Sequence, residues 1–178
     1  IATRASGAVK AEWAGDRLTV SGTFDNLETI VDVTIAGGAH LHVGAPGRNG
    51  GIAYNLTSDL NANLDGGAFS AEANTFTLTE AETEALRARN FYVNIHTLDN
   101  PGGELRGQLL AEAYFYLNAP LAGTGEQPAV NTEASGAVLL EVTGDSLVAI
   151  GGFQGLECDF NADVAGGAHL HTGLAGAN

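Results

Sequence analysis

The sequence predicts an all-β protein: an antiparallel β-sandwich or Greek-key fold with one short helix, arranged as tandem domains. Three observations carry this prediction. Short runs of alternating apolar and polar residues are separated by turns rich in glycine, of which the 178-residue chain has 25. One segment alone has helical character, and the chain repeats itself at a fixed offset. Strands in such a series, without helices between them, argue against a parallel α/β sheet.

The first copy of the repeat supplies most of the expected strands. Residues 6–12 and 17–22 flank Gly15-Asp16, a dipeptide typical of a hairpin turn. Glycine-rich turns such as 47–51 and 100–103 separate the further expected strands, which span residues 31–35, 39–43, 52–56, 69–78, 91–97 and 104–117.

The expected helix covers residues 79–89. Thr79 and Glu82 have the spacing of a capping box, in which each side chain satisfies a backbone amide at the start of a helix. The same segment contains Ala81, Ala85, Leu86 and Ala88, residue types that favour a helical backbone.

An internal repeat relates the two ends of the chain. Shifted by 129 residues, positions 3–49 align without a gap with positions 132–178, and 24 of these 47 positions are identical. The run AGGAHLH at 36–42 recurs whole at 165–171. The sequence therefore predicts one complete domain over residues 1–117, a linker over 118–131 and the N-terminal half of a second domain over 132–178.

Half of a sandwich leaves strand edges and an apolar sheet face uncovered, which isolated domains avoid. We therefore expect either a longer natural chain or completion of the second domain by strands from another chain. The second alternative predicts self-association, or binding of other extracellular proteins, through open sheet edges.

The charge of the chain excludes several classes of partner. Seven basic against 21 acidic residues give a formal net charge of -14. Such a surface repels nucleic acid and anionic lipid, and it attracts cations. No apolar run approaches the roughly 20 residues that span a bilayer. Cys158 is the one cysteine, which excludes an internal disulfide framework, and Asn55 begins a glycosylation-type triplet.

Three histidines of the first domain fall into two strand segments. In a strand, residues two apart project from the same face, so His40 and His42 point together. In residues 91–97 the apolar side chains take the odd positions, which places Asn94 and His96 on the opposite face. If these strands are neighbours, three imidazoles converge on one ion, and imidazole is a preferred ligand of zinc and copper.

Other polar residues bear on this metal hypothesis. We expect the carboxylates of Asp32, Asp99 and Glu104 to orient the imidazole N–H groups or to add a ligand. The histidine pair recurs as His169 and His171, which form at most half of a metal site because the second copy stops early.

The alternative is that each His-X-His pair is ordinary hydrogen-bonding strand surface. The sequence has no Ser-His-acid arrangement, no phosphate-binding loop and no cysteine-rich zinc site. It predicts no catalytic residue.

Two blocks of the sequence resemble the CHRD domain family, the domain first described in chordin. The first block is AHLHVG followed by GRNG, within residues 39–50, and the second is FYVNIHT running into PGGELRGQL, within residues 91–109. The resemblance covers about residues 3–111, and its first half recurs over 132–178. It implies an immunoglobulin-like or dismutase-like β module of secreted or surface-anchored proteins.

A weaker resemblance links the His-X-His strand and the later histidine to Cu,Zn superoxide dismutase. The chain lacks that enzyme's bridging histidine, zinc ligand cluster and structural disulfide.

Together, these observations predict a secreted or cell-surface structural or binding module, not an enzyme. We expect it to assemble into fibres or matrix and to bind copper or zinc through His40, His42 and His96. A copper-dependent redox enzyme of the dismutase type is the alternative.

Overall fold

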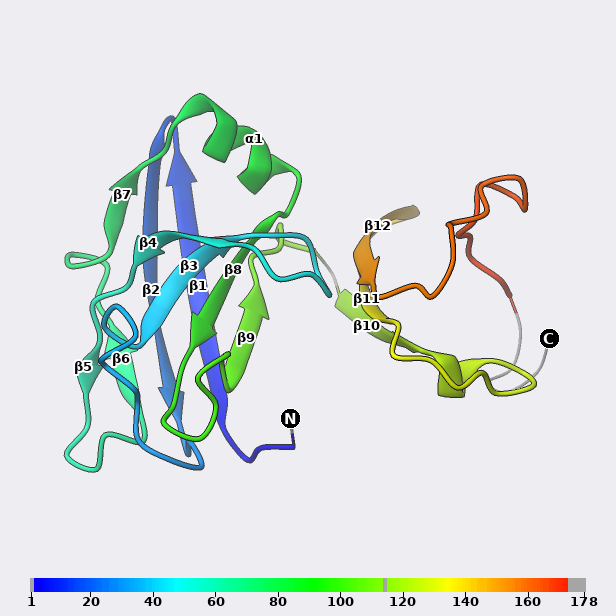
Figure 1. Cartoon of the computed structure of the whole chain (residues 1–178). Coiled ribbons are helices and arrows are strands. Elements are labelled where there is room, and N and C mark those ends of the chain that lie inside the picture. Colours follow the sequence, from blue (N-terminus) through cyan, green and yellow to red (C-terminus); the bar gives the residue numbers. More distant parts are fainter. Residues whose placement is uncertain (1, 114, 173–178) are drawn as a thin grey trace. The chain divides into compact units, whose positions relative to one another are not determined.

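The computed structural model describes residues 2–113 and 115–172, and its contacts divide the chain into two units (Figure 1). Unit 1 comprises Ile1–Gly44 and Gly50–Ala111, and unit 2 comprises Ala45–Asn49 and Glu112–Asn178. No helix among the described residues is both long and apolar enough to cross a bilayer.

Unit 1 consists of two antiparallel sheets. One has the strand order β1-β2-β6-β5, with β7 also paired to β2, and the other has the order β4-β3-β8-β9. The strands are β1 (Ser6–Ala14), β2 (Arg17–Asp25), β3 (Ala39–Val43), β4 (Gly51–Asn55), β5 (Asp59–Leu60), β6 (Gly67–Phe69), β7 (Thr75–Thr77), β8 (Phe91–Ile95) and β9 (Leu105–Gln108).

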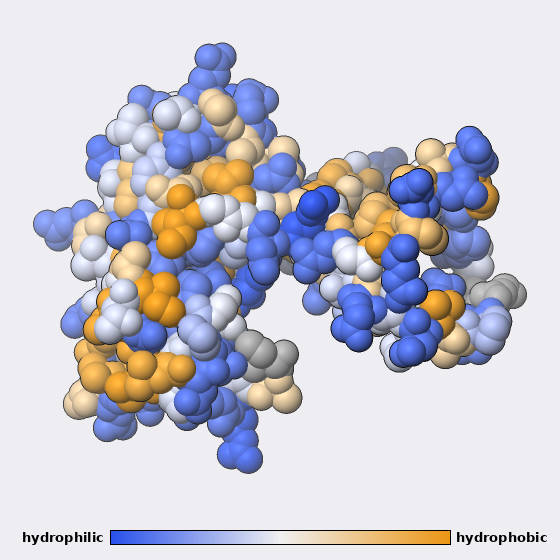
Figure 2. Space-filling view, viewed as in Figure 1, coloured by the Kyte–Doolittle hydropathy of each residue, from blue (hydrophilic) through white to orange (hydrophobic). Residues whose placement is uncertain are grey.

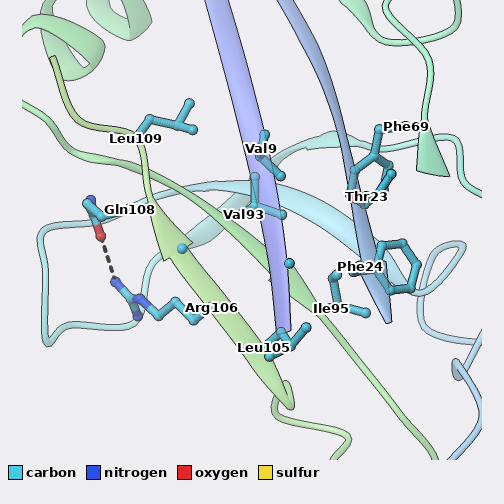
Figure 3. A pocket seen from close by; sticks show the side chains of 12 residues that line it. Val9, Thr23, Phe24, Phe69, Val93, Ile95, Leu105, Arg106, Gln108 and Leu109 are labelled. Atoms are coloured by element: carbon cyan, nitrogen blue, oxygen red, sulfur yellow. Dashed lines mark hydrogen bonds between the residues drawn. The ribbon is translucent and has the colours of Figure 1, made fainter. Parts of the chain in front are cut away.

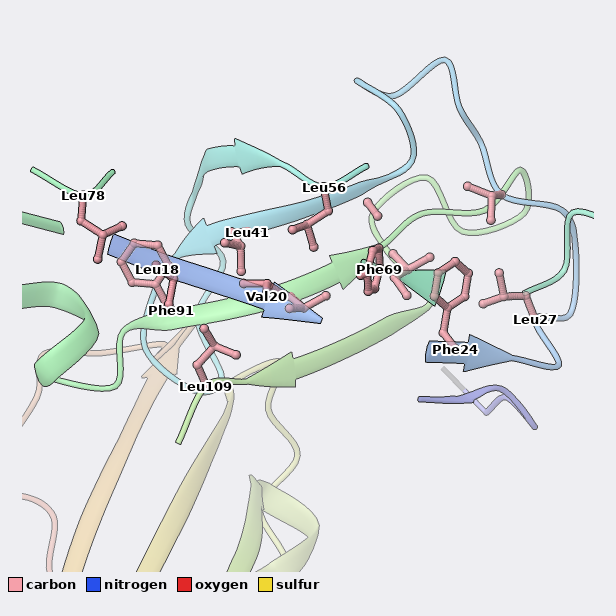
Figure 4. Packing of buried hydrophobic residues seen from close by; sticks show 14 residues of the cluster. Leu18, Val20, Phe24, Leu27, Leu41, Leu56, Phe69, Leu78, Phe91 and Leu109 are labelled. Carbon is pink, nitrogen blue, oxygen red and sulfur yellow. The ribbon is translucent and has the colours of Figure 1, made fainter. Parts of the chain in front are cut away.

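The core of unit 1 lies between these two sheets, as Figure 4 shows. Alternate residues of β2 point into it, among them Leu18 and Val20, which are fully buried. From the other sheet, Leu41 of β3 and Phe91 of β8 meet them. The predicted all-β sandwich is confirmed.

Two local predictions are also confirmed. The β1–β2 hairpin closes at the predicted Gly15-Asp16 turn, with Ala14 paired to Arg17. Helix α1 (Glu80–Arg87) begins with the predicted capping box, in which the Thr79 hydroxyl accepts from the Glu82 N–H and the Glu82 carboxylate accepts from the Thr79 N–H.

The strand predicted at 31–35 is wrong. Val31 forms one isolated bridge, to Thr97, and residues 33–37 form a turn. The Asp32 carboxylate accepts hydrogen bonds from the backbone N–H and the hydroxyl of Thr34, and Ala36 adopts a positive φ of 45°. A short acidic side chain that bonds the backbone two residues on favours a turn over a strand, even within an apolar run.

The strand predicted at 69–78 is interrupted, because residues 70–73 turn between β6 and β7. Asn74 at the end of this turn is fully buried, and its side-chain amide donates to the carbonyls of Thr57 and Ser70. The segment 104–117 is likewise divided, between β9 and the start of β10 (Phe115–Ala122).

Unit 2 contains a three-stranded sheet of order β10-β11-β12. The hairpin of β11 (Ser135–Thr143) and β12 (Ser146–Gln154) repeats the β1–β2 hairpin with the same strand bounds after the 129-residue shift. The predicted linker 118–131 contains the second half of β10 and the 3₁₀ turn Gly123–Gly125. The proposed domain boundaries themselves stay a prediction.

The described residues of unit 2 form one sheet and no second sheet that could pack on its apolar side chains. Within residues 115–172, Glu141 is the one buried residue. Phe115, Leu117 and Leu121 of β10 are 51%, 50% and 40% exposed. The space-filling view shows apolar residues at the surface in several places of the chain (Figure 2).

Candidate metal centre

Strands β3 and β8 are neighbours, as the convergence of the histidines requires. Their register pairs His40 with Asn94 and His42 with Tyr92. Paired residues share a sheet face, so both histidines lie on the face of Asn94, and His96 follows on the same face. The opposite face packs in the core, which places the three imidazoles on the outer face of this sheet.

The three imidazoles converge on this face. One ring nitrogen of each of His40, His42 and His96 lies within 4.8 Å of the corresponding nitrogens of the other two. The side chains are nevertheless buried, with exposures of 0%, 7% and 6%. Backbone carbonyls of nearby loops lie within hydrogen-bond distance of all three rings.

A backbone carbonyl holds one nitrogen of each ring. His40 Nε2 lies 3.2 Å from the Ala36 oxygen, and His42 Nδ1 lies 3.0 Å from the Gly50 oxygen. His96 Nδ1 lies 2.8 Å from the Pro101 oxygen. A carbonyl oxygen can only accept, so in each neutral ring this nitrogen carries the proton and the other presents a lone pair.

Two of the three lone-pair nitrogens have no partner among the described residues, and the third accepts a hydrogen bond from the Asn94 amide. Among the described residues, the buried His40 Nδ1 and His42 Nε2 have no hydrogen-bond partner. His96 Nε2 lies 3.3 Å from the side-chain nitrogen of Asn94. Leaving buried acceptors unpaired costs free energy, and a cation shared by the three nitrogens would remove this cost. The donor set therefore fits a transition metal ion.

Burial favours the uncharged state that a metal requires. Desolvation lowers the pKa of His40 and that of His42, and the neighbouring His96 lowers both further. Hydrogen bonds to Ala36 and Gly50 oppose this decrease without reversing it.

Acid should therefore destabilise the metal-free protein through His40 and His42. In the unfolded chain these groups take up protons below about pH 6.5, whereas in the folded chain their lowered pKa values delay protonation. The contribution of these two histidines to the free energy of unfolding is then fully present above about pH 6.5 and decreases as the pH falls towards the folded pKa values. Urea unfolding at pH 7.5 and 5.5 should show a loss on the order of 1 kcal/mol. This loss should shrink in a His40→Gln/His42→Gln variant, and an unchanged loss would contradict the assignment.

A stack of side chains adjoins His42. The Tyr92 ring lies parallel to the His42 ring at 4.8 Å, and the Arg106 guanidinium lies 3.5 Å from the centroid of the Tyr92 ring. The Tyr92 hydroxyl accepts a hydrogen bond from the Gly50 N–H. This stack was not predicted, although the alternation that places Asn94 and His96 on one face of the strand extends to Tyr92.

The carboxylates do not orient the rings as predicted, because backbone carbonyls hold the ring N–H groups, and the group of close ligand atoms found among the described residues contains no carboxylate. The Asp32 carboxylate accepts from Thr34 within its turn, and Asp99 is exposed. Glu104 is buried, where it accepts from the Thr3 and Thr97 hydroxyls at 2.6 and 2.8 Å. Burial acts to raise the pKa of Glu104, but these hydrogen bonds and that of the Glu28 N–H outweigh it and lower the pKa.

The second histidine pair lies in a different environment. The rings of His169 and His171 are 4.6 Å apart, but both residues are exposed and lie outside the strands. The group of three close ligands found among the described residues does not include them.

Comparison with known proteins identifies the family of the chain. The family model of the CHRD domain matches residues 1–109 and 117–178, which together make up most of the chain. No curated protein and no solved structure matches the chain significantly. The two matched segments agree with one full copy of the domain and one shortened copy, as the sequence predicts, and the chain therefore belongs to the CHRD domain family.

Proposed function

We propose that the chain is an extracellular binding module whose first unit holds one copper or zinc ion through His40, His42 and His96. The observation that carries this proposal is the pair of buried ring nitrogens without a partner, in rings whose other nitrogen is bonded to a carbonyl. Ordinary strand surface, the alternative drawn from the sequence, would leave such atoms to water.

The donor set narrows the choice of ion. Three imidazole nitrogens suit zinc and copper, whereas magnesium and calcium prefer oxygen ligands. The chain contains no methionine, so a thioether site for Cu(I) is disfavoured. Three protein ligands leave one position of a tetrahedral ion for water or an outside group, at which a bound ion would act as a Lewis acid.

Family membership supports a binding role. CHRD domains are non-enzymatic domains that occur in extracellular proteins. Self-association through open sheet edges, leading to fibres or matrix, is part of the same proposal, and the uncovered apolar residues of unit 2 support it.

Equilibrium dialysis against Cu²⁺ or Zn²⁺ tests the metal centre. We expect one ion per chain, because the group of three close ligands found in residues 2–113 and 115–172 does not include the second histidine pair. A His169→Ala/His171→Ala variant should keep this stoichiometry. Two ions per chain, or none, would refute the assignment. Superoxide turnover by copper-loaded protein would favour the dismutase-type alternative.

A further inference from the structure

Strand β1 has a free edge. Its nine residues pair with β2, and β1 ends the strand order of its sheet, so no other described strand is hydrogen-bonded to it. Eight of its nine residues are exposed. Long unpaired edges are templates for an added strand, because their backbone N–H and C=O groups remain available.

An apolar groove runs beside this edge. It lies between β1 and β9, has a volume of about 180 Å³, and is lined mainly by apolar residues, including Val9, Phe24, Phe69, Val93 and Leu109 (Figure 3). A strand added to β1 would therefore place alternate side chains in this groove.

The repeat indicates which strand fits. Strand β11 is the counterpart of β1, and five of their nine residues are identical, including the first four, Ser-Gly-Ala-Val. The edge of β11 is covered by β10, in a register that runs from Phe115 opposite Val142 to Ala122 opposite Ser135. Subtracting 129 from the β11 residue numbers gives the equivalent register of β10 against β1.

In the transferred register, the two faces of β10 match the two faces of β1. Phe115, Leu117 and Leu121 would stand opposite Trp13, Ala11 and Gly7, which share the groove-side face with Val9. On the other face, Tyr116 would stand opposite Glu12, as it stands opposite Glu141 in unit 2.

We propose that the free edge of β1 and its groove form an acceptor site for the segment Phe115–Ala122 of a second copy of this chain. Strand β10, which covers β11, follows the first copy of the domain in the chain and precedes the copy that contains β11. By the same rule, the strand that covers β1 comes from a domain other than the one that contains β1. When β10 moves from β11 to β1, the pairing of residues is conserved. The groove beside β1 then buries apolar side chains of β10 that are half-exposed while β10 pairs with β11. This inference rests on the proposed association through sheet edges and is independent of the metal centre.

Register-specific cross-linking tests the proposal on the full chain. In a Cys158→Ser background, Ala11→Cys and Leu117→Cys place thiols directly opposite each other, at a separation that a disulfide can bridge. Mild oxidation should yield covalent dimers and higher oligomers. A control with Ala11→Cys and Leu121→Cys sets the thiols four residues, or roughly 13 Å, out of register and should not cross-link.

The other outcomes of this experiment overturn the proposal. An intramolecular disulfide would mean that the chain's own strand fills the site, and free thiols would mean that the site takes no such strand. Sedimentation of the unaltered chain distinguishes failure of the β1 acceptor site from failure of edge association in general. Association without cross-linking refutes the β1 site alone, whereas a chain that stays monomeric at high concentration refutes edge association as well. Metal stoichiometry is unaffected in either case.

A peptide experiment avoids altering the folded chain. Trp13 is the one tryptophan and is 39% exposed at the end of β1. A synthetic peptide of residues 113–123 should shift its fluorescence to shorter wavelength with saturation at one peptide per chain. The same peptide with Leu117→Asp and Leu121→Asp should bind on the order of 100-fold more weakly, because its groove-side face is no longer apolar. No fluorescence change, or equal binding of both peptides, would refute the acceptor site.

Discussion

Replacing His96 with alanine should abolish the stabilisation of this protein by zinc or copper. A ligand present at 100 times its dissociation constant raises the free energy of unfolding by about 2.7 kcal/mol. Loss of residues that merely orient metal ligands lowers affinity 10–100-fold, so loss of a ligand should cost on the order of 100-fold or more. At the same metal concentration, the stabilisation of the His96→Ala variant would then be about 0.4 kcal/mol or less.

Thermal unfolding with and without metal measures this difference. The wild-type shift should be roughly 10 °C for a unit of about 110 residues, and the variant shift close to zero. Comparing each protein with its own metal-free form removes any effect of the substitution on folding. His169→Ala is the matched control and should shift as the wild type does. A full shift in the His96→Ala variant would show that the ion binds elsewhere.

Replacing Gly50 with alanine should damage both the fold and the metal centre. A Cβ atom at this position would overlap the carbonyl oxygen of Val43. The Gly50 carbonyl also holds His42 Nδ1, and the Gly50 N–H donates to the Tyr92 hydroxyl. We expect a loss of about 3 kcal/mol in unfolding free energy and a roughly 10-fold loss in metal affinity.

The neighbouring glycine offers a close control. A Cβ atom on Gly51 would meet nothing within 4 Å, so Gly51→Ala should leave the stability and the affinity nearly unchanged. Urea unfolding and dialysis of the two variants check the prediction. Equal behaviour of the two variants would show that the close approach of Gly50 to β3 does not constrain the chain.

The histidine cluster was predictable as far as strand periodicity reaches. Alternation alone places His40 with His42, and Asn94 with His96, and both pairs lie on the predicted face. That β3 and β8 are adjacent depends on pairing between segments some fifty residues apart, which a local pattern cannot specify. The sequence could therefore state the adjacency only as a condition, and the structure supplies it.

The atoms that orient the imidazoles could not be predicted. The sequence analysis assigned this task to acidic side chains, because carboxylates commonly hold the N–H of a metal-binding histidine. The actual acceptors are carbonyls of Ala36, Gly50 and Pro101. Every residue carries a carbonyl, so residue types contain no signal for which one points at a ring.

Comparison of the two copies of AGGAHLH distinguishes the structure that the local sequence determines from the structure that needs distant strands. In both copies the residues before the histidines form the same kind of turn, with a positive φ at Ala36 and at Ala165. The histidines of the first copy begin a strand between β4 and β8, whereas His169 and His171 lie outside the strands. The heptapeptide thus suffices for the turn, but the buried strand also needs partners distant in sequence.

The use of main-chain oxygens to aim all three rings has a consequence for how this protein tolerates evolutionary change. Side-chain replacement at Ala36 or Pro101 cannot delete an acceptor that belongs to the peptide bond. Gradual substitution around the histidines should thus be well tolerated except at Gly50, where a Cβ atom has no room, whereas a single-residue insertion or deletion in any of the three loops would misdirect a ring. Variation in the lengths of these loops, more than in their residue identities, should mark descendants in which the three imidazoles no longer converge.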